Sequence, residues 1–139
     1  MANKSVFSNG LSLPLQACLL RHKYPESKVS VKKSKLVWEG NLKPSSLSRE
    51  YKVQLICERR DNPKVFLKGS NIKGIERVDF PHHYKKTEHG VLLCLNYPAE
   101  FNYSMKLIDT IIPWTVEWLY FYEIWIYTGK WYGGGHSVV

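Results

Sequence analysis

The residues best suited to covalent chemistry in this chain surround Cys94. The thiol follows the apolar run 91–93, and His82 and His83 stand in an extended segment before it. A cysteine acts as a nucleophile when its thiolate is accessible and a donor stabilises the oxyanion that forms. The pattern indicates that Cys94 is a displayed nucleophile, and that His82 and His83 donate to the oxyanion or orient the loop that carries them.

Three interpretations of Cys94 can be weighed. A papain-like hydrolase needs a histidine base with an orienting partner, and the residues around Cys94 match no protease signature. An acyl-carrier thiol needs less, because it accepts an activated acyl group, holds it as a thioester and passes it to an amine. The third interpretation is a buried, inert thiol, since free cysteine is among the most buried residue types. In the same way, His82 and His83 can be interpreted as histidines that stabilise a loop or lie at the surface.

The composition predicts one globular domain spanning residues 1–139. Hydrophobic residues make up 44% of the chain and aromatic residues 14%, which is enough for a packed core and excludes a disordered chain. The net charge is +8. That excess suits an acidic protein partner, a nucleic acid or an anionic surface, and it is equally consistent with a solvated basic face that binds nothing.

The cysteines argue against a metal centre and against a disulfide framework. Cys18, Cys57 and Cys94 are widely spaced, and the sequence contains no CxxC pair. This pattern favours a reducing cytosol, so we expect a cytoplasmic protein without a metal or a cofactor. Cys18 and Cys57 fall on apolar faces of predicted elements and are expected to be core residues.

A first helix is predicted over residues 8–21. Ser12 is a suitable N-cap, and Pro14 is tolerated in the first turn because its missing N–H would have no partner there. The predicted buried stripe consists of Leu15, Cys18, Leu19 and Leu20.

Strands are predicted between this helix and Cys94. Short turns separate four runs of apolar residues, so they predict a four-stranded antiparallel meander. An irregular loop over residues 69–90 follows, and a loop of about 20 residues is usually functional. The predicted strands cover residues 29–31, 36–42, 51–58 and 64–67.

A long apolar helix is predicted from Thr110, its expected N-cap, to Tyr127, and Gly129 ends it. A helix this apolar must be mostly buried. A membrane span is disfavoured, because the segment falls short of about 20 apolar residues and contains Glu117 and Glu123. The spacing places four aromatic residues on one face, namely Trp114, Trp118, Phe121 and Trp125.

The predicted order of elements resembles the ubiquitin-conjugating (UBC) fold, an α+β architecture. It consists of an N-terminal helix, an antiparallel meander, an irregular flap with the cysteine, and a Trp-rich helix. Residues 80–84 (Phe-Pro-His-His-Tyr) and 89–96 (His-Gly-Val-Leu-Leu-Cys-Leu-Asn) are similar to the conjugating-enzyme pattern. In that pattern a His-Pro-Asn flap leads to a glycine and to a cysteine followed by leucine. Lys86 stands eight positions before Cys94, so the oxyanion-stabilising amide of the family is missing here.

The C-terminal part is similar to a bacterial branch of this family found in anti-phage operons of the cyclic-oligonucleotide (CBASS) type. The resemblance implies that Cys94 is the thioester-forming cysteine of an acyl transferase. It also implies a cGAS-like nucleotidyltransferase as partner, with its C-terminal tail as acyl donor, with or without an activating enzyme. Neither a nucleic acid nor a membrane is an expected partner. The shared residues are Pro113-Trp114, Glu117-Trp118-Leu119, Tyr122-Glu123, Trp125, Thr128-Gly129, Trp131 and residues 133–136.

Two alternatives use the same residues without a reaction. A non-catalytic member of the fold would bind its partner through the basic flap and the glycine-rich tail. A nearly buried Cys94 sulfur with no open groove beside it would favour this alternative. A basic nucleic-acid-binding domain would bind with a steep dependence on salt, although the sequence contains no RNP-type segment or other nucleic-acid motif.

Overall fold

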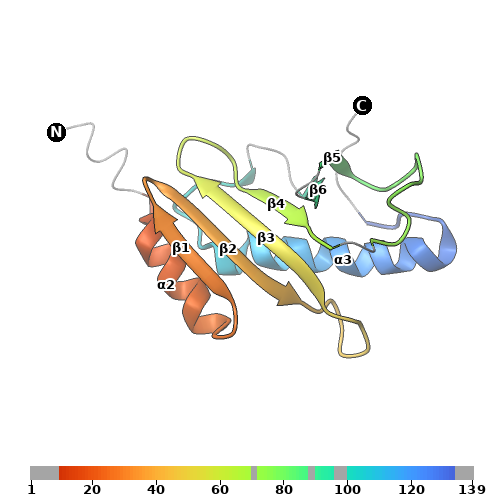
Figure 1. Ribbon diagram of the computed structural model, residues 1–139, viewed down its shortest axis with the longest axis horizontal. Helices are drawn as coiled ribbons and strands as arrows, with labels where there is room; N and C mark the ends of the chain where they lie inside the picture. Colours follow the sequence, from red (N-terminus) through yellow and green to blue (C-terminus); the bar gives the residue numbers. More distant parts are fainter. Residues whose placement is uncertain (1–9, 70–71, 88–89, 96–99, 134–139) are drawn as a thin grey trace.

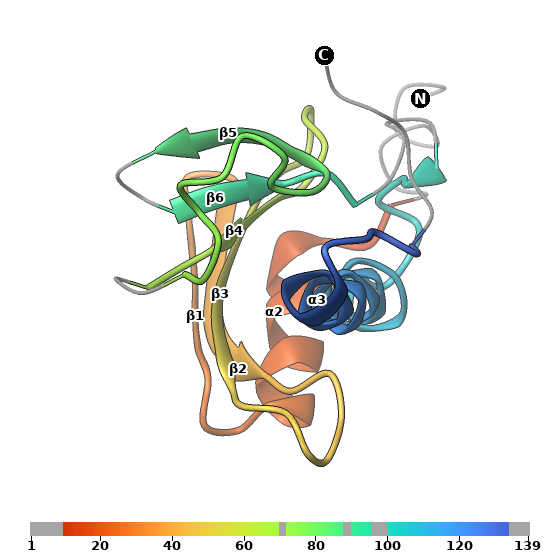
Figure 2. The same ribbon diagram turned by 90° about the vertical axis from the view of Figure 1, so that its right-hand side faces the viewer.

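The computed structural model describes residues 10–69, 72–87, 90–95 and 100–133. It is an α+β structure in which a six-stranded antiparallel sheet, in the order β1-β2-β3-β4-β6-β5, carries two helices on one face (Figure 1, Figure 2). The helices are α2 (Leu13–Lys23) and α3 (Ile111–Thr128), with the short 3-10 helix η2 (Leu107–Asp109) before α3. The strands are β1 (Lys28–Lys32), β2 (Lys35–Leu42), β3 (Tyr51–Glu58), β4 (Lys64–Leu67), β5 (His83–Thr87) and β6 (Gly90–Leu93).

Helix α2 begins at Leu13, later than the predicted residue 8. Ser12 is its N-cap as predicted, because the Ser12 Oγ accepts a hydrogen bond from the Leu15 amide over 3.2 Å. The predicted buried stripe is confirmed at Leu20, which is 0% exposed, and is wrong at Leu15, which is 44% exposed, and at Cys18, which is also exposed. The face that packs on the sheet is rotated away from both exposed residues, so Cys18 is not a core residue. The buried residues of α2 are Leu13, Gln16, Ala17 and Leu20.

Gln16 is a buried polar residue that ties α2 to the segment before α3. Its Nε2 donates to the carbonyl of Met105 over 2.9 Å, and its Oε1 accepts from the amide of Leu107 over 3.0 Å. Both ends of the side-chain amide are therefore satisfied in the core. These two bonds fix the approach to α3 against the N-terminal helix.

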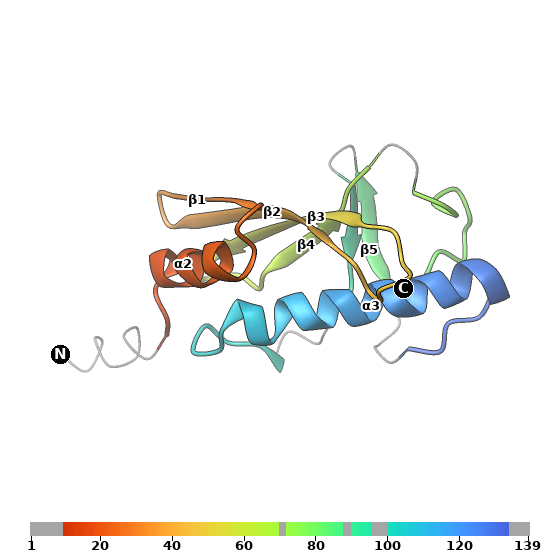
Figure 3. The same cartoon turned by 90° about the horizontal axis from the view of Figure 1, so that it is seen from below.

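The predicted meander is confirmed in β1–β4, which pair antiparallel in sequence order. Alternation puts Leu36 and Trp38 of β2 on the same face as Leu55 of β3, and all three are buried. Cys57 shares this inner face and is 0% exposed, which confirms it as a core residue. Both helices lie on one side of the meander (Figure 3).

The sheet is larger than the predicted four-stranded meander, and part of the predicted irregular loop over residues 69–90 is a strand. Within that segment β5 pairs with β6, and β6 pairs with β4. The pattern gave no sign of β5 because its three central residues, Tyr84, Lys85 and Lys86, are all exposed and lack apolar alternation. Gly90 begins β6 with φ 128°, and a Cβ at this position would clash with the carbonyl oxygen of Leu67.

Helix α3 forms most of the core opposite the sheet. Gly129, with φ 76°, ends it as predicted. Thr110 is not a side-chain cap, because its Oγ1 donates to the carbonyl of Lys106 over 2.8 Å. Trp114 and Phe121 of the predicted aromatic face are only partly buried. The buried residues of α3 are Ile111, Ile112, Thr115, Trp118, Leu119, Tyr122 and Trp125.

None of the helices in the described part of the chain combines the length and the hydropathy that a membrane-spanning helix needs.

Candidate active site around Cys94

Cys94 directly follows β6 and is held by the segment at the start of β5. Its amide donates to the carbonyl of His82 over 3.0 Å, which continues the pairing of the two strands. The residue is 3% exposed, so the sulfur is not displayed at the surface in the way the sequence suggested. The physical reason is that β6 is an interior strand, with β4 on one side and β5 on the other. Residues 96–99 lie outside the described residues.

Tyr84 brings a hydroxyl group to the Cys94 sulfur. The pairing of β5 with β6 shifts between His83 and Lys85, so Tyr84 is the extra residue of a β-bulge. Bulges turn a side chain away from the regular alternation of a strand. Here the Tyr84 hydroxyl forms a side-chain hydrogen bond with Cys94. The Tyr84 side chain is also 43% exposed, so this one residue contacts both the sulfur and the solvent.

The electrostatics of this pair keep both groups protonated near neutral pH. Burial raises the pKa of the Cys94 thiol above its ordinary value, and the hydrogen bond from Tyr84 acts in the opposite direction. Burial is also the main reason why the pKa of Tyr84 is raised to about 12. Tyr84 is therefore a neutral hydrogen-bond donor near neutral pH.

His82 contacts Cys94 through its main chain. Its carbonyl accepts hydrogen bonds from the Cys94 amide and from the Trp118 Nε1, the latter over 3.1 Å. The imidazole ring packs on Trp131, with ring centroids 5.0 Å apart. The backbone of His82 has φ 27°, which is unusual for a residue other than glycine. His82 therefore joins the end of β6 to α3.

His83 pairs with Leu93 at the end of the β5–β6 ladder. Its ring packs edge-on against Phe80, with centroids 5.3 Å apart. Burial lowers its pKa, and the nearby ammonium of Lys86 lowers it further, so the imidazole is neutral at physiological pH. Its Nδ1 is buried and meets no hydrogen-bond partner among the described residues.

Lys86 stands eight positions before Cys94, where the conjugating-enzyme pattern has the asparagine of its His-Pro-Asn flap. Its ammonium donates to the carbonyls of Ile75 and Arg77, the second over 3.3 Å, and lies 5.2 Å from the ring centroid of Phe80. Lys86 thus fastens the segment 72–80 to β5. In this arrangement it is a structural cation, and Tyr84 is the residue that brings a donor to the sulfur.

A hollow of about 340 Å³ is lined by Tyr84, whereas Cys94 is not one of its lining residues. Its walls come from the β3–β4 turn, the start of β4 and the end of β6. Tyr84 is part of the lining, so the hollow reaches the residue that bonds to the sulfur. The other lining residues are Asp61, Asn62, Pro63, Lys64, Val65, Leu92, Leu93 and Leu95.

The described site brings together Cys94, the main chain of His82 and the hydroxyl of Tyr84. The rings of His82 and His83 pack on aromatic side chains, and the roles predicted for the two imidazoles stay predictions. Tyr84 was not predicted as a site residue from the sequence. The position of Tyr84 next to the two histidines was a weak indication of a role at the site. The bulge that turns its side chain toward the sulfur could not be predicted from the sequence. His89 and the glycine-rich residues 134–136 lie outside the described residues.

The described part of the chain contains no group of three or more His, Cys, Asp or Glu side chains that could hold a metal ion.

Comparison with known proteins places the chain in a family. The family described as Type II CBASS E2 protein matches residues 16–138, a range that contains all six strands, α3 and the pair of Cys94 and Tyr84. No curated protein matches the chain. Because the match covers most of the sequence, the chain belongs to the family of Type II CBASS E2 proteins.

Proposed function

We propose that this protein is a ubiquitin-conjugating-like acyl transferase of Type II CBASS anti-phage defence, built as a single UBC-like domain. Cys94 receives the C-terminal acyl group of a partner protein as a thioester and passes it to an amine. The observation that carries this proposal is the hydrogen bond between Tyr84 and the Cys94 sulfur at the end of β6, in a chain of the E2 family.

The reaction consists of two acyl transfers. In the first, the Cys94 sulfur bonds to the carbonyl carbon of an activated acyl donor, and the thiol proton leaves with the donor's leaving group. In the second, an amine attacks the thioester carbon, the C–S bond breaks, and a proton from the amine restores the thiol. Sulfur carries negative charge as the thiolate that attacks in the first transfer and as the thiolate that leaves in the second. A neutral hydroxyl donor such as Tyr84 stabilises that charge.

The 3% exposure of Cys94 sets a requirement for this reaction. A donor carbonyl can reach the sulfur only if the segment around Cys94 opens, and the hollow that Tyr84 lines is the place from which the donor would enter. The hollow offers apolar walls, including Val65 and Leu93, that suit a narrow chain terminus. We therefore place the acyl donor in this hollow.

We propose the C-terminal tail of a cGAS-like nucleotidyltransferase as the acyl donor. Membership in the Type II CBASS E2 family supports this choice of partner. An activating enzyme would supply the tail in activated form, unless the operon partner arrives already activated.

Co-expression with the operon partners tests the thioester. Intact-mass measurement is expected to show an adduct of the protein with the partner's acyl group, released by dithiothreitol and missing in Cys94→Ala. Cys18→Ala is the matched control, because Cys18 is an exposed thiol and its loss should leave the adduct unchanged. An adduct that survives in Cys94→Ala, or no adduct in any sample, would remove the catalytic assignment.

A second function is favoured by the burial of the sulfur. A non-catalytic binding module of the same family would keep Cys94 as a core thiol, in agreement with its 3% exposure and raised pKa. In that case cells carrying Cys94→Ala would keep full protection against phage. Loss of protection in Cys94→Ala, with normal expression and folding, excludes the module.

A further inference from the structure

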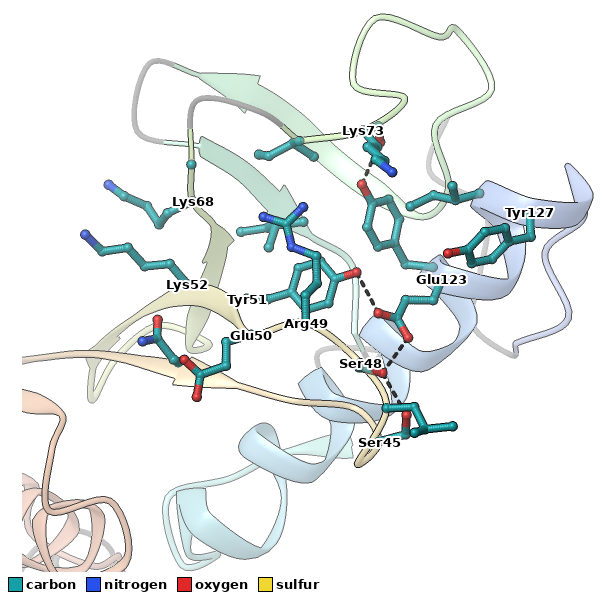
Figure 4. A pocket seen from close by; sticks show the side chains of 17 residues that line it. Ser45, Ser48, Arg49, Glu50, Tyr51, Lys52, Lys68, Lys73, Glu123 and Tyr127 are labelled. Carbon is teal, nitrogen blue, oxygen red and sulfur yellow. Dashed lines mark hydrogen bonds between the residues drawn. The ribbon is translucent and has the colours of Figure 1, made fainter.

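We propose that a second hollow, distant in the fold from Cys94, is a docking site for an acidic peptide segment that also carries apolar side chains. This hollow has a volume of about 830 Å³ and lies between the β2–β3 loop and the C-terminal half of α3 (Figure 4). We name it the basic hollow. Its size falls within the range of protein ligand sites.

The charge of the basic hollow is the first reason for an acidic occupant. Four cations, Arg49, Lys52, Lys68 and Lys73, line it, against two carboxylates, Glu50 and Glu123. Among the described residues, no carboxylate forms an ion pair with Arg49, Lys68 or Lys73, and Lys52 has only a long one with Glu39 at 3.9 Å. Their charges are therefore available to a partner.

The two carboxylates offset only part of this charge, because four cations stand against them in the lining. Glu123 accepts hydrogen bonds from the hydroxyls of Ser48 (2.6 Å) and Tyr51 (2.8 Å), as the dashed lines in Figure 4 show. Its carboxylate is thus occupied in holding the β2–β3 loop against α3. Glu50 lies among the lining residues on the β3 side, near Lys52 (Figure 4).

The walls of the basic hollow are fixed before a partner arrives. The loop side is held by the Glu123 network, to which Ser45 is joined through a 2.8 Å contact with Ser48. The opposite side is held by the Tyr122 hydroxyl, which donates to the carbonyl of Lys73 over 2.6 Å. A preorganised site loses less conformational entropy on binding than a mobile one.

Apolar residues on the rim are the second reason. Leu47 of the loop is 97% exposed and Tyr127 of α3 is 86% exposed, and both line the basic hollow. Large apolar side chains displayed beside a built hollow are typical of a protein-binding surface. A segment that carries both carboxylates and apolar side chains would cover these two residues and neutralise the cations.

A single-stranded nucleic acid fits these residues less well. Such a ligand needs exposed aromatic rings on which its bases stack. Arg49 covers the ring of Tyr51 at 5.5 Å from its centroid, and Tyr122 is buried. Only Tyr127 remains as an exposed ring among the lining residues that the structure describes.

The basic hollow can be occupied while Cys94 reacts. The basic hollow is lined by Leu67 at the end of β4, whereas the hollow beside Tyr84 is lined by Lys64 and Val65 at the start of the same strand. Docking at one end and acyl transfer at the other would bring a partner to the protein without blocking the sulfur. The docking proposal also holds for a non-catalytic module, so it does not depend on the thioester.

A peptide selection tests the docking site without knowledge of the natural partner. A library of random dodecapeptides is selected on the wild-type protein, and the most enriched peptides are synthesised with a fluorescent label for anisotropy. The expected peptides have a net negative charge and at least one large apolar residue. Their affinity is expected to fall by at least about tenfold in the double variant Lys68→Glu, Lys73→Glu. It is expected to fall in Leu47→Ser as well.

The matched control is the double variant Lys32→Glu, Lys35→Glu. These exposed lysines face each other at the β1–β2 hairpin, away from the basic hollow, so affinity should change less than about twofold. Cys94→Ala should bind the peptides as the wild type does. The proposal is overturned by the absence of enrichment, by enriched peptides without acidic residues, or by equal losses in both double variants. Binding of an oligothymidine that depends on Lys68 and Lys73, with no peptide enriched, would assign the hollow to nucleic acid instead.

Discussion

The hydroxyl of Tyr84 can be removed with little other change, which makes Tyr84→Phe a sharp test of the active-site proposal. The substitution keeps the ring and therefore the packing, and it removes the donor that bonds to the Cys94 sulfur. Because this donor lowers the pKa of Cys94, its loss must raise that pKa further. The thiolate population near neutral pH, and with it the reactivity of the sulfur, must fall.

The size of the effect follows from the position of Tyr84. Hydrogen bonds to charged groups contribute about 1.5–3 kcal/mol. Tyr84 is 43% exposed, so water partly replaces the lost donor and the lower end of that range applies. About 1.5 kcal/mol corresponds to a roughly tenfold slower acyl transfer.

The assay has two parts. Alkylation of Cys94 by iodoacetamide is followed by peptide mass mapping over a range of alkaline pH, with the exposed Cys18 as an internal standard. Tyr84→Phe should move the Cys94 profile to higher pH and leave that of Cys18 in place, and thioester formation should slow by about tenfold. Tyr120→Phe, which removes an exposed hydroxyl from α3, is the control. Unchanged Cys94 profiles and transfer rates in Tyr84→Phe would refute the role of Tyr84.

Three further predictions concern the scaffold. Gln16→Leu leaves the Met105 carbonyl and the Leu107 amide unpaired, and urea unfolding should show a loss of about 2–3 kcal/mol, against little change in the outer-face control Gln54→Leu. Gly90→Ala should cost about 1–3 kcal/mol in the same assay, because of its positive φ and the clash with β4. Burial raises the pKa of Cys57 from 9.0 to about 12, so its contribution to stability is complete below pH 9 and is lost as the pH rises toward 12. Cys57→Val should flatten the alkaline fall in the urea midpoint; an equally steep fall would contradict this.

The parts of the fold that follow from periodicity could be predicted. The alternation in β3 identified Cys57 as a core residue, and the apolar run before Gly129 identified α3. The face of α2 could not be predicted in this way, because its core side includes the polar Gln16. A buried glutamine becomes acceptable only through its partners at Met105 and Leu107, which lie far away in the sequence.

The candidate site also has one part that could be predicted from local sequence and another part that depends on distant residues. Cys94 was identified from its place after an apolar strand and from a family pattern. Its burial and its partner depend on β5, whose exposed residues carry no strand signal. The bulge at Tyr84 depends on a register that only the paired strand defines, and no local property of the sequence encodes it.

The account depends most on Cys94 as the atom that carries the acyl group, and replacing its sulfur by oxygen tests this directly. Cys94→Ser co-expressed with the operon partners should accumulate an oxygen ester, which resists dithiothreitol and which peptide mass mapping locates on residue 94. Acyl groups found only on lysines, or an unmodified serine in every preparation, would contradict the account.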